Sequence, residues 1–278
     1  MTSQKLRVGA VSYLNSKPLL YGLAEQASTV GVADQESTVE LSLDVPSRLA
    51  DRLADGELDV ALIPSIETFR DPMYTVVSDA CIACRGPVLS VKLFFRRPPE
   101  SVRRLALDDG SRTSVALARI LLAERFGLTP ELEPLPLGAS IDETDADAVL
   151  LIGDRAIHSP VGRFAAVWDL GDEWYRSTGL PFVFAMWTAR PSAQLGTLEA
   201  VLAEARDRGL ANLEQIAAAE APALGLTQPQ CLSYLRDNLH FRLGPQEEAG
   251  LRRFYDSAAA LDLVPKGLRF GRARRQTA

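Results

Sequence analysis

The chain has 278 residues, of which 47% are hydrophobic and 24% charged, a composition typical of a globular protein rather than of a disordered one. Its 30 basic and 36 acidic residues give a net charge of −6, which argues against bulk attraction to nucleic acid or to an anionic membrane. No apolar run approaches the about 20 residues that span a bilayer, and only 3 cysteines are present, too few for a disulfide scaffold. The N-terminus has a strand-like segment where a secretory signal has its apolar core, so we expect a cytoplasmic protein with no membrane or nucleic-acid partner.

The first part of the chain alternates apolar runs with helix-start signals. The three runs, interpreted as buried strands, are residues 6–11, 39–45 and 58–63. After the first run, Asn15 or Ser16 can cap a helix whose first turn holds Pro18. Helix openings also follow the other two runs, at Pro46 and at Pro64. This order predicts an α/β unit around a parallel sheet, with the binding end at the carboxyl ends of the strands.

A second α/β block follows two long β segments, residues 76–84 and 87–95, and a linker-like stretch at 96–100. Its predicted elements are strands at 104–107, 132–135, 148–152 and 165–168, and helices at 111–126 and from Gly153. Residues 180–188 are a last apolar run, and the pattern after them is helical.

The second block is therefore inserted between two β crossings, near Phe95 and near Phe184. We predict an α/β fold with two lobes: residues 1–95 plus 188–278 form lobe 1, and residues 96–187 form lobe 2. Two such lobes with a ligand cleft between them are typical of the type 2 periplasmic-binding-protein-like fold.

Familiar catalytic signatures are absent from the sequence. There is no Gly-rich phosphate loop, no G-x-S-x-G elbow and no H-E-x-x-H helix, and the two histidines, His158 and His240, have contexts that favour surface or structural roles. Cys81 and Cys84 form a C-x-x-C pair on a β-like run rather than at a strand-to-helix turn, which favours buried thiols, with Cys84 a candidate to line a site. We expect neither a metal nor a redox cofactor.

Hydroxyl, amide and glycine residues gather instead at four strand-to-helix junctions. The junctions are Ser12/Asn15/Ser16, Ser65, Ser111/Thr113/Ser114 and Gly153/Asp154. Unpaired N–H groups at a helix N-terminus bind carboxylates, so several such ends facing one cleft suit a small, multiply anionic organic molecule. Simple helix capping is the better explanation for any one junction alone and the preferred role for Asp154, whereas four junctions at the carboxyl edges of two sheets favour a ligand site.

Six segments that span most of the first 190 residues carry a resemblance to a known family. They are residues 11–19 (VSYLNSKPL), 61–67 (ALIPSIE), 86–91 (GPVLSV), 111–117 (SRTSVAL), 151–154 (LIGD) and 178–184 (TGLPFVF). Together they resemble the chorismate dehydratases of menaquinone biosynthesis by the futalosine route. The resemblance implies loss of water from chorismate to give 3-[(1-carboxyvinyl)oxy]benzoate, without metal, flavin or nicotinamide.

The resemblance also implies the site residues. Asn15 would orient the reacting groups, while Ser12 and Ser65 bind from lobe 1, and Ser111, Thr113 and Ser114 hold a carboxylate from lobe 2. The remaining candidates for substrate binding are Cys84, Gly86 and Gly153. Cys84 departs from the hydroxyl residue expected near that position in relatives.

Removal of the C3 proton and of the 4-hydroxyl makes the ring aromatic, so the protein has to select this elimination by orientation in a closed cleft. The base is open among Glu67, Asp154 and the enolpyruvyl carboxylate of the substrate, of which we prefer the last. Two alternative functions also stay open, a binding protein for a small carboxylate and the related naphthoate-forming enzyme of the same route. The oligomeric state is not predictable from these patterns.

Overall fold

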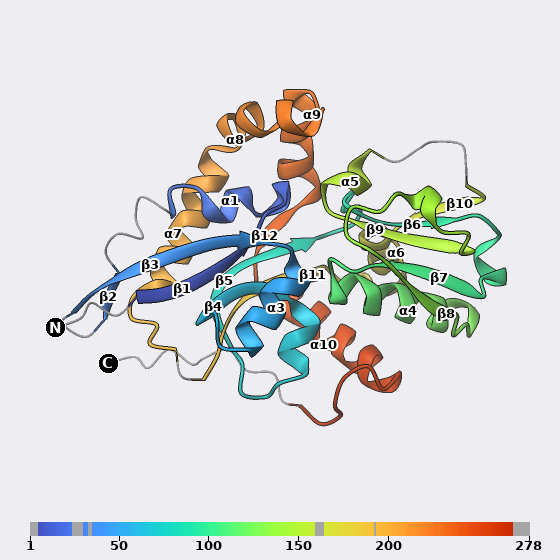
Figure 1. Cartoon of the computed structure of the whole chain (residues 1–278), viewed down its shortest axis with the longest axis horizontal. Coiled ribbons are helices and arrows are strands. Elements are labelled where there is room, and N and C mark those ends of the chain that lie inside the picture. Colours follow the sequence, from blue (N-terminus) through green and yellow to red (C-terminus); the bar gives the residue numbers. More distant parts are fainter. Residues whose placement is uncertain (1–4, 24–29, 33–34, 159–163, 192, 269–278) are drawn as a thin grey trace.

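The computed structural model describes residues 5–23, 30–32, 35–158, 164–191 and 193–268. Two lobes lie side by side, each built on its own β-sheet with helices packed against it (Figure 1). The larger sheet has the strand order β12-β5-β11-β4-β1-β3-β2 and the smaller one β10-β6-β9-β7-β8. None of the helices in these ranges is long and apolar enough to cross a membrane.

The larger lobe combines the start of the chain with its end. Its strands are β1 (Lys5–Val11), β2 (Val30–Val32), β3 (Gln35–Asp44), β4 (Val60–Pro64), β5 (Thr75–Cys84), β11 (Phe182–Ala189) and β12 (His240–Arg242). Its helices are α1 (Lys17–Leu20), α3 (Pro46–Ala54), α7 (Leu198–Ala211), α8 (Leu213–Glu220), α9 (Gln228–Ser233) and α10 (Pro245–Ala260). β1 pairs in parallel with β3 and β4, and β11 runs antiparallel between β4 and β5. Every residue of β4 and of β11 is buried, which explains why both read as continuous apolar runs.

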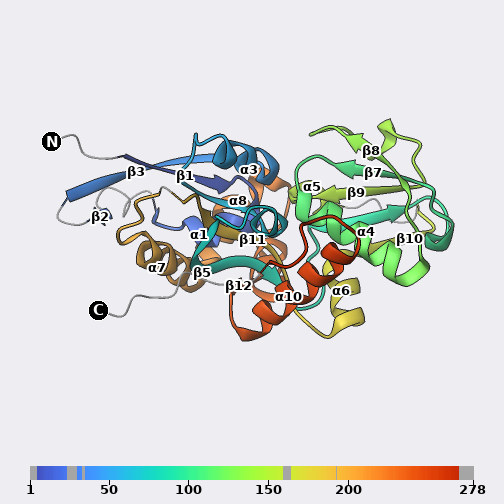
Figure 2. The same ribbon diagram turned by 90° about the horizontal axis from the view of Figure 1, so that it is seen from below.

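The smaller lobe is one continuous stretch of chain. Its strands are β6 (Val91–Phe95), β7 (Arg104–Asp108), β8 (Glu131–Leu135), β9 (Ala148–Ile152) and β10 (Ala166–Asp169), and its helices are α4 (Arg112–Phe126), α5 (Asp154–Ile157) and α6 (Leu170–Thr178). α4 begins at the N-cap Ser111, as predicted, and ends at Gly127, whose φ of 67° is left-handed. α10 of the larger lobe lies beside α4 (Figure 2), where the Ser257 hydroxyl donates to Glu124 at 2.7 Å.

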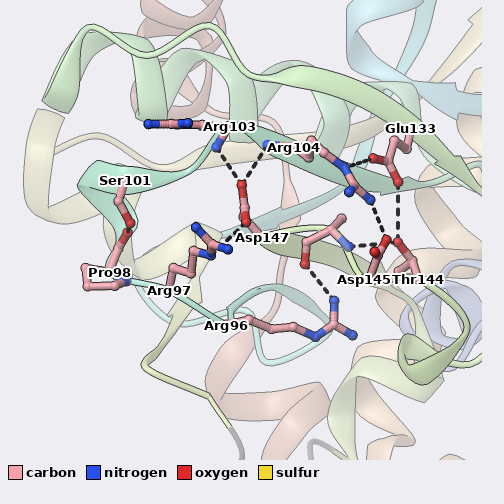
Figure 3. Close-up of polar contacts among 11 residues, drawn as sticks. Arg96, Arg97, Pro98, Ser101, Arg103, Arg104, Glu133, Thr144, Asp145 and Asp147 are labelled. Carbon is pink, nitrogen blue, oxygen red and sulfur yellow. Dashed lines mark hydrogen bonds and ion pairs between the residues drawn. The ribbon is translucent and has the colours of Figure 1, made fainter.

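A polar cluster lies at the amino ends of β7 and β9, and Figure 3 shows its contacts. The Asp147 carboxylate accepts the backbone N–H groups of Arg103 and Arg104 at 2.9 and 3.1 Å and pairs with Arg97 at 3.1 Å. The Arg96 guanidinium donates to the carbonyl of Ala146 at 2.7 Å. These contacts hold the stretch between β6 and β7, so the predicted linker is a tied loop at the amino ends of β7 and β9.

The chain crosses between the lobes earlier than the sequence pattern indicates. β6 belongs to the smaller sheet and β11 to the larger, so the crossings lie at residues 85–90 and 179–181 rather than near Phe95 and Phe184. The apolar run 87–95 hides the first crossing, because its first residues turn, with Leu89 at φ 60°, before β6 starts.

Two elements differ from the expectation for other reasons. β12 is a strand within the region expected to be helical throughout, since His240 and Arg242 pair with the edge of β5. The opening after β1 is not a full helix: a 3₁₀ turn at Leu14–Ser16 leads into a helix of only 4 residues.

Candidate active site

A small cavity of about 40 Å³ lies between the lobes, at the carboxyl ends of β1 and β9 and at the start of α4. Its polar lining comes from both lobes and consists of Tyr13, Asn15, Ser90, Ser111, Ser114 and Gly153. The other lining residues are apolar. The cavity is therefore a hydroxyl- and amide-lined space where strand ends of both sheets meet, which is where ligands bind in open α/β folds.

Asn15 sits in the 3₁₀ turn directly after β1. The Ser16 hydroxyl fixes this turn by donating to the carbonyls of Val11 and Tyr13, the latter at 2.9 Å. The Asn15 Oδ1 atom is buried and has no hydrogen-bond partner within the part of the chain that the structure describes. Because a buried, unpaired acceptor costs about 1–3 kcal/mol, Oδ1 is suited to receive a hydrogen bond from a ligand.

The N-terminus of α4 forms the opposite wall. Ser111 caps this 15-residue helix, and both the N–H and the hydroxyl of Ser114 donate to its Oγ, at 3.4 and 3.2 Å. The preceding loop is held by the Asp108 carboxylate, which accepts the Gly110 N–H at 2.9 Å and is neutralised by Arg155. A helix N-terminus beside the cavity favours a negatively charged group of a ligand.

The Tyr13 ring of the larger lobe packs directly against the backbone of Gly153 in the smaller lobe. Gly153 has φ 69° and ψ −158°, and a Cβ atom built on it would lie 2.9 Å from the Tyr13 Cζ atom. Burial, and then the negative charge of Asp108, raise the pKa of the Tyr13 phenol to about 12. The phenol is therefore protonated at neutral pH.

Four of the nine predicted site residues line this cavity, namely Asn15, Ser111, Ser114 and Gly153, and five do not. Ser12 is exposed, because the turn after β1 directs the next residue, Tyr13, to the cavity instead. The Ser65 hydroxyl donates to the Val183 carbonyl at 2.7 Å and is fully buried behind the site.

The other three residues outside the lining have packing roles. The Thr113 Oγ1 accepts the Ile66 N–H at 3.2 Å and so joins the two lobes. Cys84 and Gly86 pack against Gly171 at the start of α6, where a Cβ atom would lie 2.6 Å from the Cys84 Sγ and equally close to the Gly86 carbonyl oxygen. Tyr13 and Ser90 are the two polar lining residues that the sequence did not predict, although both lie inside the segments that carry the family resemblance.

Neither acidic candidate for the base lines the cavity. The Asp154 carboxylate accepts the Leu14 N–H at 3.1 Å, and burial raises its pKa although this hydrogen bond lowers it. Glu67 is paired with Arg70 at 2.7 Å and with Arg112 at 3.4 Å. Both carboxylates hold structure together, Asp154 by linking the lobes.

The two histidines lie elsewhere as well. His158 contacts the Leu224 carbonyl at 2.7 Å, and His240 lies beside Arg85 and Glu247. Among the described residues that line the cavity, none carries a carboxylate, an imidazole or an amine.

A larger, more open groove of about 770 Å³ runs along α4, is lined by α3 of the larger lobe and by β7 and β8 of the smaller one, and shares Ser111 with the cavity. Its charged side chains largely satisfy one another, as in the pair between Arg112 and Asp51 at 2.6 Å. The cavity is the better candidate site, because it lies at the strand ends of both sheets and holds the unpaired Asn15 acceptor.

Direct hydrogen bonds join the lobes around the cavity. In addition to Leu14 with Asp154, the Ser47 N–H donates to the Gly110 carbonyl at 3.0 Å. The structure is therefore a closed form, whose cavity has room for only a few water molecules.

Comparisons with known proteins agree with this architecture. Residues 6–260 match the family model described as menaquinone biosynthesis. The chorismate dehydratase of Thermus thermophilus is 34% identical over 239 residues, 80% of this chain and 87% of that protein. The chorismate dehydratase of Campylobacter jejuni is 26% identical over 256 residues, 92% of this chain and 99% of that protein. In fold, the chain is similar to the periplasmic aliphatic sulphonate binding protein SsuA of Escherichia coli, with a TM-score of 0.61, 18% identity and 96% of each chain covered.

Proposed function

The chain belongs to the menaquinone biosynthesis family, and from that membership we propose that it dehydrates chorismate in the cavity between its lobes. The two curated relatives that share most of its length are chorismate dehydratases, which supports an enzyme rather than a binding protein. The structural observation that carries the proposal is the buried, unpaired Asn15 Oδ1 in a neutral cavity.

The reaction removes the C3 proton and the 4-hydroxyl of chorismate and gives 3-[(1-carboxyvinyl)oxy]benzoate. The 4-hydroxyl can donate a hydrogen bond, and the Asn15 Oδ1 is a buried acceptor without a donor. A carboxylate of the substrate is placed at the N-terminus of α4, where Ser111 and Ser114 supply polar contacts. Asn15 then orients the leaving group relative to the ring.

The base is the enolpyruvyl carboxylate of the substrate itself. A general base has to reach the proton that it removes, and Glu67 and Asp154 are both outside the lining. The Tyr13 phenol, with its pKa raised to about 12, is not a base at neutral pH. The cavity therefore supplies orientation and exclusion of water, while the substrate supplies the proton acceptor.

Substrate entry requires the lobes to separate. A cavity of about 40 Å³ is too small for a ring that carries two carboxylate-bearing groups. The bonds from Leu14 to Asp154 and from Ser47 to Gly110 break on opening, and the lobes stay further apart around the bound substrate than they are in this form.

The test is turnover of chorismate by the purified protein, with the product identified by mass spectrometry. The Asn15 side chain caps neither the 3₁₀ turn nor α1, so Asn15→Ser removes no capping hydrogen bond, while its shorter hydroxyl does not reach the leaving group. We therefore expect turnover about a hundredfold lower and a nearly unchanged Tm. The matched control is Asn212→Ser, at the end of α7, where the amide donates to the Arg208 carbonyl at 2.7 Å.

Two results would contradict the proposal. If chorismate binds and is recovered unchanged, the protein is a carboxylate-binding protein. If the turnover rate of Asn15→Ser is within threefold of that of the unmodified protein, as we expect for Asn212→Ser, Asn15 has no role in the reaction.

A further inference from the structure

A π-helix, Tyr234–Asn238, contacts the first lobe crossing at two points. The Tyr234 hydroxyl donates to the Ser90 Oγ at 2.9 Å, and the Asn238 Nδ2 donates to the Pro87 carbonyl at 2.9 Å. π-Helical turns are rare, because their geometry is less favourable than that of an α-helix. Where they do occur, they are frequently at functional sites. This one holds both ends of the short segment that brings Ser90 to the cavity.

The same segment is held from the smaller lobe. The Asp169 carboxylate accepts the N–H groups of Val88 and Leu89 at 2.9 and 2.6 Å, and the Ser90 N–H donates back to the Val88 carbonyl at 2.8 Å. Leu89 has a φ of 60°, which is unfavourable for a side chain of this kind. Such strain persists only where the surrounding structure determines the backbone, and it clusters at active sites.

The direction of the hydrogen bond to Ser90 follows from the surroundings of Tyr234. Burial raises the pKa of its phenol far above the usual range, although hydrogen bonds with Ser90 and with the Asn15 amide lower it. The phenol therefore keeps its proton, and the geometry of the contact makes it the donor and the Ser90 oxygen the acceptor. The Ser90 hydroxyl hydrogen has no acceptor within the described part of the chain, and the cavity lies beside it.

We propose that Tyr234 is a positioning residue that fixes the Ser90 hydroxyl as a hydrogen-bond donor toward the oxygen that leaves chorismate. Negative charge develops on this oxygen as the bond to C4 breaks, so a donor aimed at it stabilises the transition state more than the bound substrate. Asn15 accepts a hydrogen bond from the 4-hydroxyl of chorismate, which contains this oxygen. The Tyr234 phenol therefore contacts both side chains, Asn15 and Ser90, that bind the leaving group. The inference rests on the proposed function, because it concerns the same reaction and cavity.

The test is a double-mutant cycle of Tyr234→Phe and Ser90→Ala, measured as kcat and KM for chorismate. We expect Tyr234→Phe to lower kcat about tenfold with KM within about twofold, since the ring stays and only the donor is lost. Ser90→Ala should lower kcat at least as much. The double variant should be no slower than Ser90→Ala alone, because Tyr234 acts through Ser90.

The matched control is Tyr255→Phe in α10. Its hydroxyl, in a tyrosine that is also buried, donates to the Pro265 carbonyl at 3.0 Å, remote from the cavity lining. The same hydroxyl accepts the Leu268 N–H at 2.8 Å, so this variant loses two hydrogen bonds. Its Tm should fall at least as much as that of Tyr234→Phe, while kcat stays within twofold.

Two outcomes overturn the inference. One is a kcat of Tyr234→Phe within twofold of the unmodified protein, and the other is a full additional loss when Tyr234→Phe is combined with Ser90→Ala. Failure of the proposed function is distinct, since the unmodified protein would then leave chorismate unchanged and no kcat could be measured for any variant.

Discussion

Replacing Gly153 by alanine should disturb both the stability and the activity of the protein. The backbone there has φ 69° and ψ −158°, a region that is almost exclusive to glycine and costs other residues about 1–3 kcal/mol. The new Cβ atom would also lie 2.9 to 3.0 Å from three atoms of the Tyr13 ring, closer than carbon atoms approach one another. The ring belongs to the other lobe, so it is displaced or the lobes close incompletely.

The control is Gly127→Ala at the end of α4. Gly127 has a similar φ of 67°, but no atom lies within 4 Å of an added Cβ, so only backbone strain of about 1 kcal/mol is expected. For a chain of this size that corresponds to a Tm lower by about 2–4 °C, with normal turnover. For Gly153→Ala we expect a loss of about 3 kcal/mol and turnover reduced at least tenfold.

Thermal unfolding and chorismate turnover, measured on the same preparations, decide between these expectations. In a Tyr13→Ala background, Gly153→Ala should cost less stability than it does in the unmodified protein, because the contact with the ring is then absent and only the backbone strain is left. The reasoning is refuted if Gly153→Ala matches Gly127→Ala in Tm and keeps turnover within twofold of the unmodified protein.

Two further predictions concern ionisable groups away from the cavity. Burial alone would raise the pKa of Asp59, but hydrogen bonds from Arg7 and Arg190 hold it below the ordinary 3.8. Asp59→Asn should therefore cost about 2 kcal/mol at pH 7. Urea titrations should show this difference shrinking as the pH falls from 3.8 through the lower pKa of the folded protein, and an undiminished loss at pH 3 would contradict the ion-pair explanation. Burial raises the pKa of the Cys231 thiol to about 11 and that of the Cys84 thiol still further. Iodoacetamide at pH 8 should therefore label neither thiol in the folded protein and both after unfolding. Rapid labelling of Cys84 in the folded protein would show that the first crossing opens.

Local chemistry in the sequence was sufficient for much of the fold. Ser111 and Gly127 mark the ends of α4 because capping and left-handed termination are properties of a few neighbouring residues. The lobe crossing at 85–90 was missed because nothing local separates its apolar residues from those of β6. Its turn depends on Asp169, which lies about eighty positions further along the chain.

The candidate site was predictable only in part for the same reason. Asn15, Ser111 and Ser114 lie at helix starts whose direction follows from the strand before them. Choosing Ser12 over Tyr13 relied on polarity, whereas the turn after β1 decides which side chain faces the cavity. Tyr234 carries no local signal, because it lies in a helical stretch and reaches the site only through the π-helix.

The position of β11 in the larger sheet has a consequence for synthesis of the chain on the ribosome. β11 lies between β4 and β5, and it follows the whole smaller lobe in sequence. A nascent chain that has emerged only as far as α6 can complete the smaller lobe, but it presents β4 and β5 with unpaired edges made of apolar residues. β4 and β5 thus leave the ribosome well before the strand that lies between them, and the chain needs protection of those edges until residues 182–189 arrive.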